Sequence, residues 1–230
     1  MAFATAWREL YALFALVGAL VTAWLWFAMP AGSPGRETSV LSAQQLARPG
    51  LASLCIAAFL MGASSTAIWT FGADLLRTTP GFPDAGIAIA WVMLGLGGLA
   101  GASSGVLADR FSVNFMHRAA LLGMAFSYAM LGIAVVAPFL AVAAMALFGA
   151  AYITSSGILL IRGIALLPDR PDLGLGIPFL AVAIGQTVGA PLFGGVLDLA
   201  GPSMALSLFG AATCAAMFCR MEDAAHPGRK

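Results

Sequence analysis

Apolar residues in this chain form long runs, separated by short breaks of charge, proline or glycine. A helix needs about 20 apolar residues to cross a bilayer core about 30 Å thick. Seven runs have roughly that length, and each predicts a membrane-spanning helix. The predicted spans are 10–29, 51–76, 87–107, 119–136, 139–161, 173–197 and 204–219.

Composition strengthens this prediction, because 61% of the residues are hydrophobic and only 9% are charged. So few polar side chains cannot cover the surface of a soluble globule. The chain is therefore expected to be an all-α, polytopic membrane protein with the lipid bilayer as a partner. A net charge of +1, with Lys230 as its single lysine, argues against nucleic acid as a partner.

Positive charge is distributed unevenly between the two sides of the predicted membrane domain. Nine of the eleven Lys and Arg residues fall in breaks on one side, and only Arg8 and Arg77 fall on the other. Because short cytoplasmic loops retain Lys and Arg, the sequence predicts a multi-pass inner-membrane protein with its N-terminus outside and its C-terminus in the cytoplasm.

The longest break predicts how the chain is divided. It mixes Pro, Gly, Ser, Gln and charge, as a linker does. We expect a lone transmembrane helix at 1–29, a cytoplasmic linker at 30–50, a six-helix bundle at 51–219 and a cytoplasmic tail at 220–230. With its N-terminus outside the membrane and a single helix before the linker, the chain is expected to lack a bundle of helices that would precede that helix. The alternative for the first run is a cleaved signal peptide, although the run is long for one.

A glycine pattern precedes the most charged loop. Gly97, Gly101 and Gly105 recur every fourth residue, so they predict a stripe along one helix face that has no side chains and that another helix can approach closely. The segment 101–109 also resembles 189–198, since each has a Gly-Ala pair, a later Gly and a final Asp. The two Asp residues would face opposite membrane sides, so the last six helices are predicted to form a three-plus-three inverted repeat.

Six helices in such a repeat, preceded by a basic linker and one more helix, resemble the C-terminal half of a major facilitator superfamily transporter. That family has a loop in which Gly is followed four residues later by Asp, then Arg or Lys, then Gly one residue on. Gly105, Asp109 and Arg110 match, whereas Ser112 stands where the family has Gly. Arg118, next to His117, is the trailing basic residue. The resemblance implies that the spans correspond to helices six to twelve of a twelve-helix member.

The same loop suggests a gate, because charges beside a close-packed glycine seam can hold two helical units in one of two arrangements. Gly105, Asp109, Arg110 and Arg118 are therefore the gating-loop candidates. A plain positive-inside loop is the alternative for the arginines.

Polar residues near the middle of apolar helices are the candidates for the transport path, because an unpaired polar group there is costly. The resemblance favours the second and fifth predicted helices, which line the central cavity in that family. Small hydroxyls can instead bond to their own helix backbone. The transport-path candidates are Trp69, Thr70, Tyr152, Ser155 and Gln186.

Four further residues have structural interpretations. Asp74 and Arg77 lie one helical turn apart and are expected to form an ion pair near the outer end of their helix. Arg162 is expected to reach out to the cytoplasmic interface. Trp91 is interpreted as an interfacial anchor.

The leading hypothesis is a secondary active transporter, or the C-terminal part of one, that moves a small solute by alternating access, with or without a coupled proton. The alternatives are a truncated or split half-transporter that needs its missing bundle or a second chain, and a seven-helix receptor or scaffold. No enzyme activity, cofactor, catalytic residue or metal site is expected, since no cluster of His, Asp, Glu or Cys lies at depth.

Overall fold

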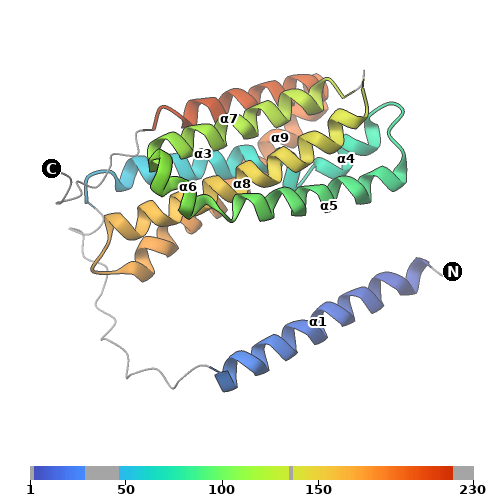
Figure 1. Cartoon of the computed structure of the whole chain (residues 1–230). Coiled ribbons are helices and arrows are strands. Elements are labelled where there is room, and N and C mark those ends of the chain that lie inside the picture. The colour runs from blue at the N-terminus through green and yellow to red at the C-terminus, as the bar shows by residue number, and fades with distance from the viewer. Residues whose placement is uncertain (1–2, 29–46, 135–136, 220–230) are drawn as a thin grey trace. The chain divides into compact units, whose positions relative to one another are not determined.

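The computed structural model describes residues 3–28, 47–134 and 137–219, in which every secondary-structure element is an α-helix (Figure 1). The prediction of an all-α protein is therefore confirmed. The chain divides into two units, residues 1–42 and 43–230, and each is described by itself.

The first unit contains the helix α1 (Phe3–Ala28). Its 26 residues correspond to a length of about 39 Å at the rise of an α-helix. Residues Arg8–Ala28 form a stretch long and apolar enough to cross a membrane.

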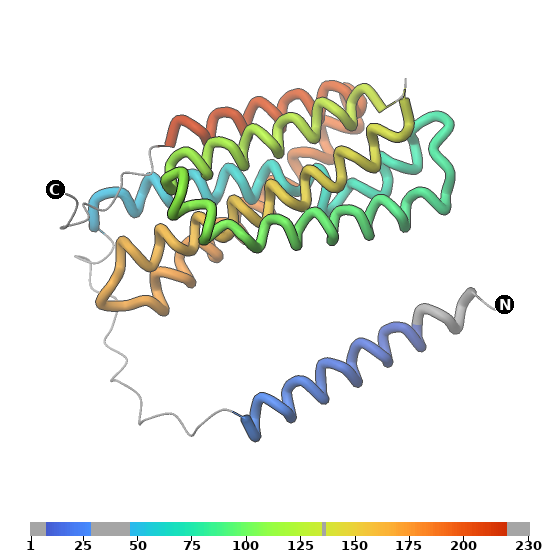
Figure 2. The backbone as a smooth tube through the Cα atoms, in the orientation of Figure 1, coloured from blue at the N-terminus to red at the C-terminus, as the bar shows by residue number. Residues whose placement is uncertain are grey.

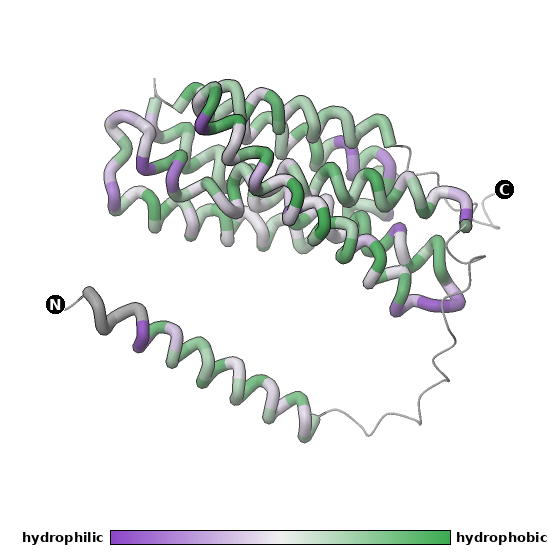
Figure 3. The backbone as a smooth tube through the Cα atoms, turned by 180° about the vertical axis from the view of Figure 1, so that it is seen from behind, coloured by the Kyte–Doolittle hydropathy of each residue, from purple (hydrophilic) through white to green (hydrophobic). Residues whose placement is uncertain are grey.

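The second unit is a bundle of helices that run roughly along one direction (Figure 2). Hydrophilic residues concentrate towards its two ends (Figure 3), as expected of a protein whose middle lies in a bilayer. Its helices are α3 (Leu51–Trp69), α4 (Gly72–Thr78), α5 (Asp84–Gly101), α6 (Ser104–Phe111), α7 (Val113–Gly132), α8 (Phe139–Leu166) and α9 (Pro171–Ala216).

Five of the described helices, namely α1, α3, α5, α8 and α9, are long and apolar enough to span a membrane. The predicted run 51–76 is interrupted at Thr70 and Phe71, and the run 87–107 is interrupted at Ala102 and Ser103. Seven spans and an inverted repeat therefore remain predictions.

The helix α9 is two helices in one. Its 46 residues would measure about 69 Å if straight, more than twice a bilayer core. Gly201, with φ 81° and ψ 173°, interrupts the helical dihedrals, and Pro202 follows it. Figure 1 shows the last, red part of α9 running back beside α7. The predicted runs 173–197 and 204–219 fall on these two legs.

Glycines bring two pairs of helices into backbone contact. A Cβ at Gly97 of α5 would overlap the carbonyl of Ala146 in α8, and a Cβ at Gly149 would overlap that of Leu94. Between α3 and α9, Gly62 meets Val182 and Gly189 meets Ala63 in the same way. These two glycine seams are the close approaches that small residues permit between membrane helices.

The predicted glycine stripe is correct at Gly97 and Gly101 but wrong at Gly105. A Cβ at Gly101 would press on Ala150 and Ile153 of α8, whereas one at Gly105 would meet nothing within 4 Å. The reason is the interruption at Ala102 and Ser103, which ends the helical register before Gly105.

The expected loop around residues 109–118 is a tight corner between two helices. α6 ends at Phe111 and α7 begins at Val113, so Ser112 alone separates them. Ser112 has φ 72° and ψ 147°, a conformation that glycine adopts easily and other residues do not. Its hydroxyl accepts a hydrogen bond from the Phe115 amide at 3.3 Å and so caps α7.

Candidate functional site

Three of the bundle's polar side chains meet near the middle of the bundle. Tyr152 is the fourteenth of the 28 residues of α8, and Gln186 is the sixteenth residue of α9, near the middle of its first leg. Ser65 is the fifteenth residue of the stretch that α3 and α4 form together. The Gln186 amide Nε2 donates to the Ser65 hydroxyl at 3.3 Å and to the Tyr152 hydroxyl at 3.4 Å. We call Ser65, Tyr152 and Gln186 the polar trio.

Aromatic rings adjoin the polar trio on one side. The ring of Trp69 stands edge-on to that of Tyr152, with 5.5 Å between centroids, and edge-on to that of Phe148 at 6.0 Å. Phe148 stacks on Tyr152 at 5.6 Å with an angle of 20° between planes. Trp91 of α5 completes the group at 6.0 Å from Trp69. Such pair distances and angles are favourable for aromatic rings.

The group is partly open. Trp69 is 39% exposed, and Tyr152 and Gln186 are half-buried, whereas Phe148 is fully buried. The buried ring therefore anchors the cluster, and the other three side chains offer a surface that another molecule can contact.

Neighbouring residues hold the site in place. The Tyr128 hydroxyl, buried in the bundle, donates to the Ser64 carbonyl at 2.8 Å and ties α7 to α3 next to Ser65. Ser64, Ser65 and Thr66 each donate to a carbonyl three residues earlier, as predicted for small hydroxyls in a membrane helix. The glycine seam at Gly62 and Gly189 fixes α9 against α3 at the same level.

Of the five transport-path candidates, the structure brings Trp69, Tyr152 and Gln186 together. Ser155 is fully buried in α8, one turn from Tyr152, and its hydroxyl has no hydrogen-bond partner among the described residues. Thr70 is the exposed residue that ends α3, and its amide donates to the Thr66 carbonyl. Thr70 thus has a capping position, although it adjoins Trp69.

Sequence reasoning missed two aromatic members of the site. Phe148 looks like any core residue in an apolar run, and only its ring contacts assign it here. Trp91 was expected to anchor the membrane interface, but it is the eighth of the 18 residues of α5 and contacts Trp69. In the predicted run 87–107 it is the fifth residue, so the sequence carried no signal against an interfacial position.

The gating-loop candidates gather at one end of the bundle, which we call the α6 end. Figure 1 shows the start of α3, α6 and the end of α8 at this end. Asp109 and Arg110 are exposed in the last turn of α6, and Arg118 is exposed in α7. Arg48, just before α3, joins the same end by an ion pair with Asp169 and a 2.8 Å hydrogen bond to the Leu166 carbonyl.

His117 lies between these exposed charges, yet its side chain is fully buried. It faces the end of α9 near Ala216, and neither ring nitrogen makes a hydrogen bond of normal geometry within the described chain. Burial is the main cause that lowers the pKa of His117 from 6.5 to about 4, and the neighbouring Arg118 lowers it further. The residue precedes the predicted span 119–136 and was expected in an open loop, which is wrong.

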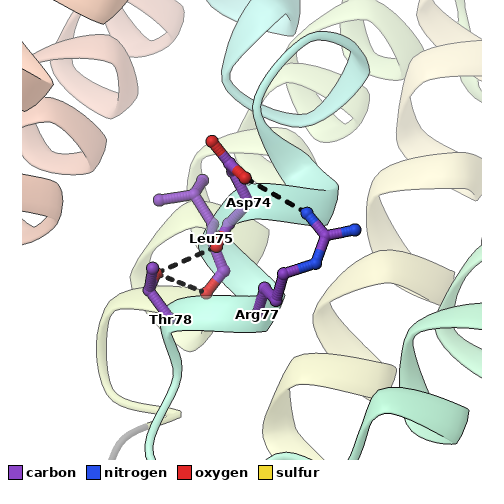
Figure 4. Close-up of polar contacts among 4 residues, drawn as sticks. All are labelled: Asp74, Leu75, Arg77 and Thr78. Atoms are coloured by element: carbon purple, nitrogen blue, oxygen red, sulfur yellow. Dashed lines mark hydrogen bonds and ion pairs between the residues drawn. The ribbon is translucent and has the colours of Figure 1, made fainter.

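The opposite end of the bundle carries the predicted ion pair. Arg77 donates to Asp74 at 3.2 Å in α4, and both side chains are exposed (Figure 4). Thr78 donates to the carbonyls of Asp74 and Leu75 in the same turn (Figure 4). Arg162, four residues before the end of α8, is only 5% exposed, so neighbouring helices cover its side chain.

Within the described residues, no three His, Cys, Asp or Glu side chains gather closely enough to hold a metal ion. What the site offers is a set of neutral hydrogen-bonding groups beside aromatic rings.

Comparison with known proteins adds no family assignment, because no family model, curated protein or solved structure matches the chain.

Proposed function

We propose that the chain is a secondary active transporter, or the C-terminal part of one, which moves a small solute past the polar trio by alternating access. Its proposed setting is an inner membrane, with the N-terminus outside and the α6 end in the cytoplasm. The proposal keeps the resemblance to the major facilitator superfamily as its framework.

One observation carries the proposal. Ser65, Tyr152 and Gln186 come from α3, α8 and α9, and they converge near the middle of α8 and of the first leg of α9. Polar groups at that depth are costly unless they have partners, and transporters bind their substrates near the bilayer midplane. Three independent helices would not be expected to converge on hydrogen-bonding groups there by apolar packing alone.

A second observation supports the framework. The resembled loop signature has Gly where this chain has Ser112, and Ser112 has a positive φ. The corner thus keeps the backbone shape for which glycine is suited. Asp109 and Arg110 next to it are exposed, so they are available to a second helical unit.

Thiol accessibility tests the transport path. In a background with Cys55, Cys214 and Cys219 replaced by Ala, we would introduce Gln186→Cys and, as a matched control on α9, Val188→Cys. Val188 is an exposed apolar residue of the same helix, two positions away. Sealed vesicles of both orientations would then be treated with a charged, membrane-impermeant thiol reagent.

We expect Gln186→Cys to be labelled from both sides and Val188→Cys from neither. Labelling of Gln186→Cys from neither side would contradict a transport path, and labelling from one side alone would favour a receptor over a transporter. The alternative of a split half-transporter is tested by repeating the assay after co-expressing any helices that are encoded directly upstream. Two-sided labelling and solute uptake by the chain alone would rule that alternative out.

A further inference from the structure

We propose that the site formed by the polar trio and Trp69 takes an uncharged solute that has a flat ring face and at least one hydrogen-bond donor. This inference rests on the proposed function and adds the chemical class of the solute. It follows from three features of the site: its rings, its free acceptor and its distance from charge.

The rings provide a face for a flat group. Trp69 and Tyr152 are partly exposed, as is Trp91, and Phe148 behind them is fully buried. Because Phe148 stacks on Tyr152, the Tyr152 ring is held in one orientation. A ring that enters the site can therefore stack against a surface that is already ordered, which reduces the entropy lost on binding.

The Gln186 amide supplies the hydrogen-bonding requirement. Its Nε2 is used by the Ser65 and Tyr152 hydroxyls, at 3.3 and 3.4 Å. No hydrogen bond to its Oε1 exists among the described residues, and the side chain is only half-buried. An amide oxygen is an acceptor, so the group that completes the site must be a donor.

No charged residue lies within four positions of Ser65, Trp69, Tyr152 or Gln186 along the chain, which is about one helical turn. Along α8, Arg162 is ten residues from Tyr152, or about 15 Å. Along α9, Asp198 is twelve residues from Gln186, or about 18 Å. Asp74 of α4 follows Trp69 most closely in sequence, but it is already paired with Arg77.

The side chains that form the site, Ser65, Trp69, Tyr152 and Gln186, carry no formal charge that could pair with an ion. Removing an ion from water without a counter-charge is far more costly than removing an uncharged group that keeps its hydrogen bonds. Ring faces attract a cation, but this attraction is weak compared with the loss of hydration. The site is for these reasons better matched to an uncharged solute than to a cation or an anion.

Three probes with the same ring test the inference: 2-naphthamide, which is uncharged, 2-naphthylmethylammonium, a cation, and 2-naphthoate, an anion. Binding to the full chain in nanodiscs would be measured by calorimetry, with empty nanodiscs subtracted to remove partitioning into lipid. We expect the amide to bind at least tenfold more tightly than either ion.

Substitutions at Gln186 test whether the probes bind at this site. Gln186→Leu is expected to weaken 2-naphthamide about tenfold, and Gln186→Glu to shift the preference towards the cation. Thr187→Val is the matched control, because the Thr187 hydroxyl donates to the carbonyl of Ala183 in its own helix at 2.9 Å. It should leave all three affinities unchanged, and thermal melting would verify that each variant is folded.

The outcomes separate this inference from the proposed function. If an ion binds more tightly than the amide and Gln186→Leu abolishes the difference, the solute class is wrong although the site remains. If no probe responds to Gln186→Leu or Gln186→Glu in folded protein, the inferred class is also wrong. Two-sided thiol accessibility at Gln186 would in that case still support the transport path.

Discussion

The middle of the bundle and its α6–α7 corner, residues 102–118, are both rich in small residues, but these residues are used differently. In the middle, Gly62, Gly97 and Gly149 press helices into backbone contact. At the corner, a Cβ at Gly105 would meet nothing within 4 Å, Ser112 has a strained backbone and His117 is buried without a normal hydrogen bond. The middle is thus built to stay in place, while the corner stores local strain.

This difference suggests that the middle of the bundle serves binding and that the corner serves gating. A site that depends on a few long hydrogen bonds needs helices that do not shift, and the glycine seams and the Tyr128 hydroxyl provide that support. A gate needs an element with two arrangements of similar energy, and strained or unsatisfied groups lower the difference between them. Three stability measurements test this difference between the middle of the bundle and the corner.

The largest effect is expected in a seam. Gly149→Ala adds a Cβ that overlaps the backbone of Leu94, so α5 and α8 must move apart. We expect a loss of about 3 kcal/mol in the free energy of unfolding, at the upper end for overpacking. Thermal melting in detergent measures it.

Gly95→Ala is the matched control for this change, because a Cβ at Gly95 meets nothing within 4 Å. It should be neutral or stabilise α5 by up to about 1 kcal/mol through helix propensity. Equal melting temperatures for the two variants would contradict the seam.

A smaller effect is expected from acid at the corner. The folded protein has a His117 pKa of about 4 against 6.5 ordinarily, so the unfolded state binds more protons between these values. Stability should therefore fall as the pH is lowered through 6.5, by about 2 kcal/mol between pH 7.5 and pH 5, and level off below pH 4.

His117→Met removes this titration and retains an apolar side chain in the buried space. The variant should lose much of the dependence of melting temperature on pH between 7.5 and 5. An unchanged pH profile in the folded variant would show that His117 is not the group responsible.

The smallest effect is expected at Ser112. Ser112→Gly relieves a backbone strain of about 1 to 3 kcal/mol but loses the cap and gains freedom in the unfolded chain. The expected balance is a stabilisation of about 0.5 to 1 kcal/mol. Ser112→Ala keeps the strain and loses only the cap, so it should destabilise by about 1 kcal/mol. If glycine destabilised as much as alanine, the corner would not be strained.

Sequence patterns predicted much of the site because its members are exceptions. Gln186, Tyr152 and Trp69 stand out from apolar runs, and a polar group in such a run needs a partner or a function. Phe148 could not be found in this way, since an aromatic residue in an apolar run is indistinguishable from core. The same limit applied to Gly105, whose spacing matched the stripe although the helix had already been interrupted.

Run length and the scarcity of charge in the sequence were enough to predict a helical chain with segments apolar enough to cross a membrane, because a helix satisfies its own backbone hydrogen bonds where water is absent. The sequence also marked Asp74 and Arg77 as a pair, since their spacing within one helix fixes their distance. The packing of the helices, which run lengths do not reveal, brings Ser65, Tyr152 and Gln186 together and buries Arg162 and His117. These facts depend on which helix faces lie against one another, and the glycine seams set those faces by contacts between residues far apart in the chain.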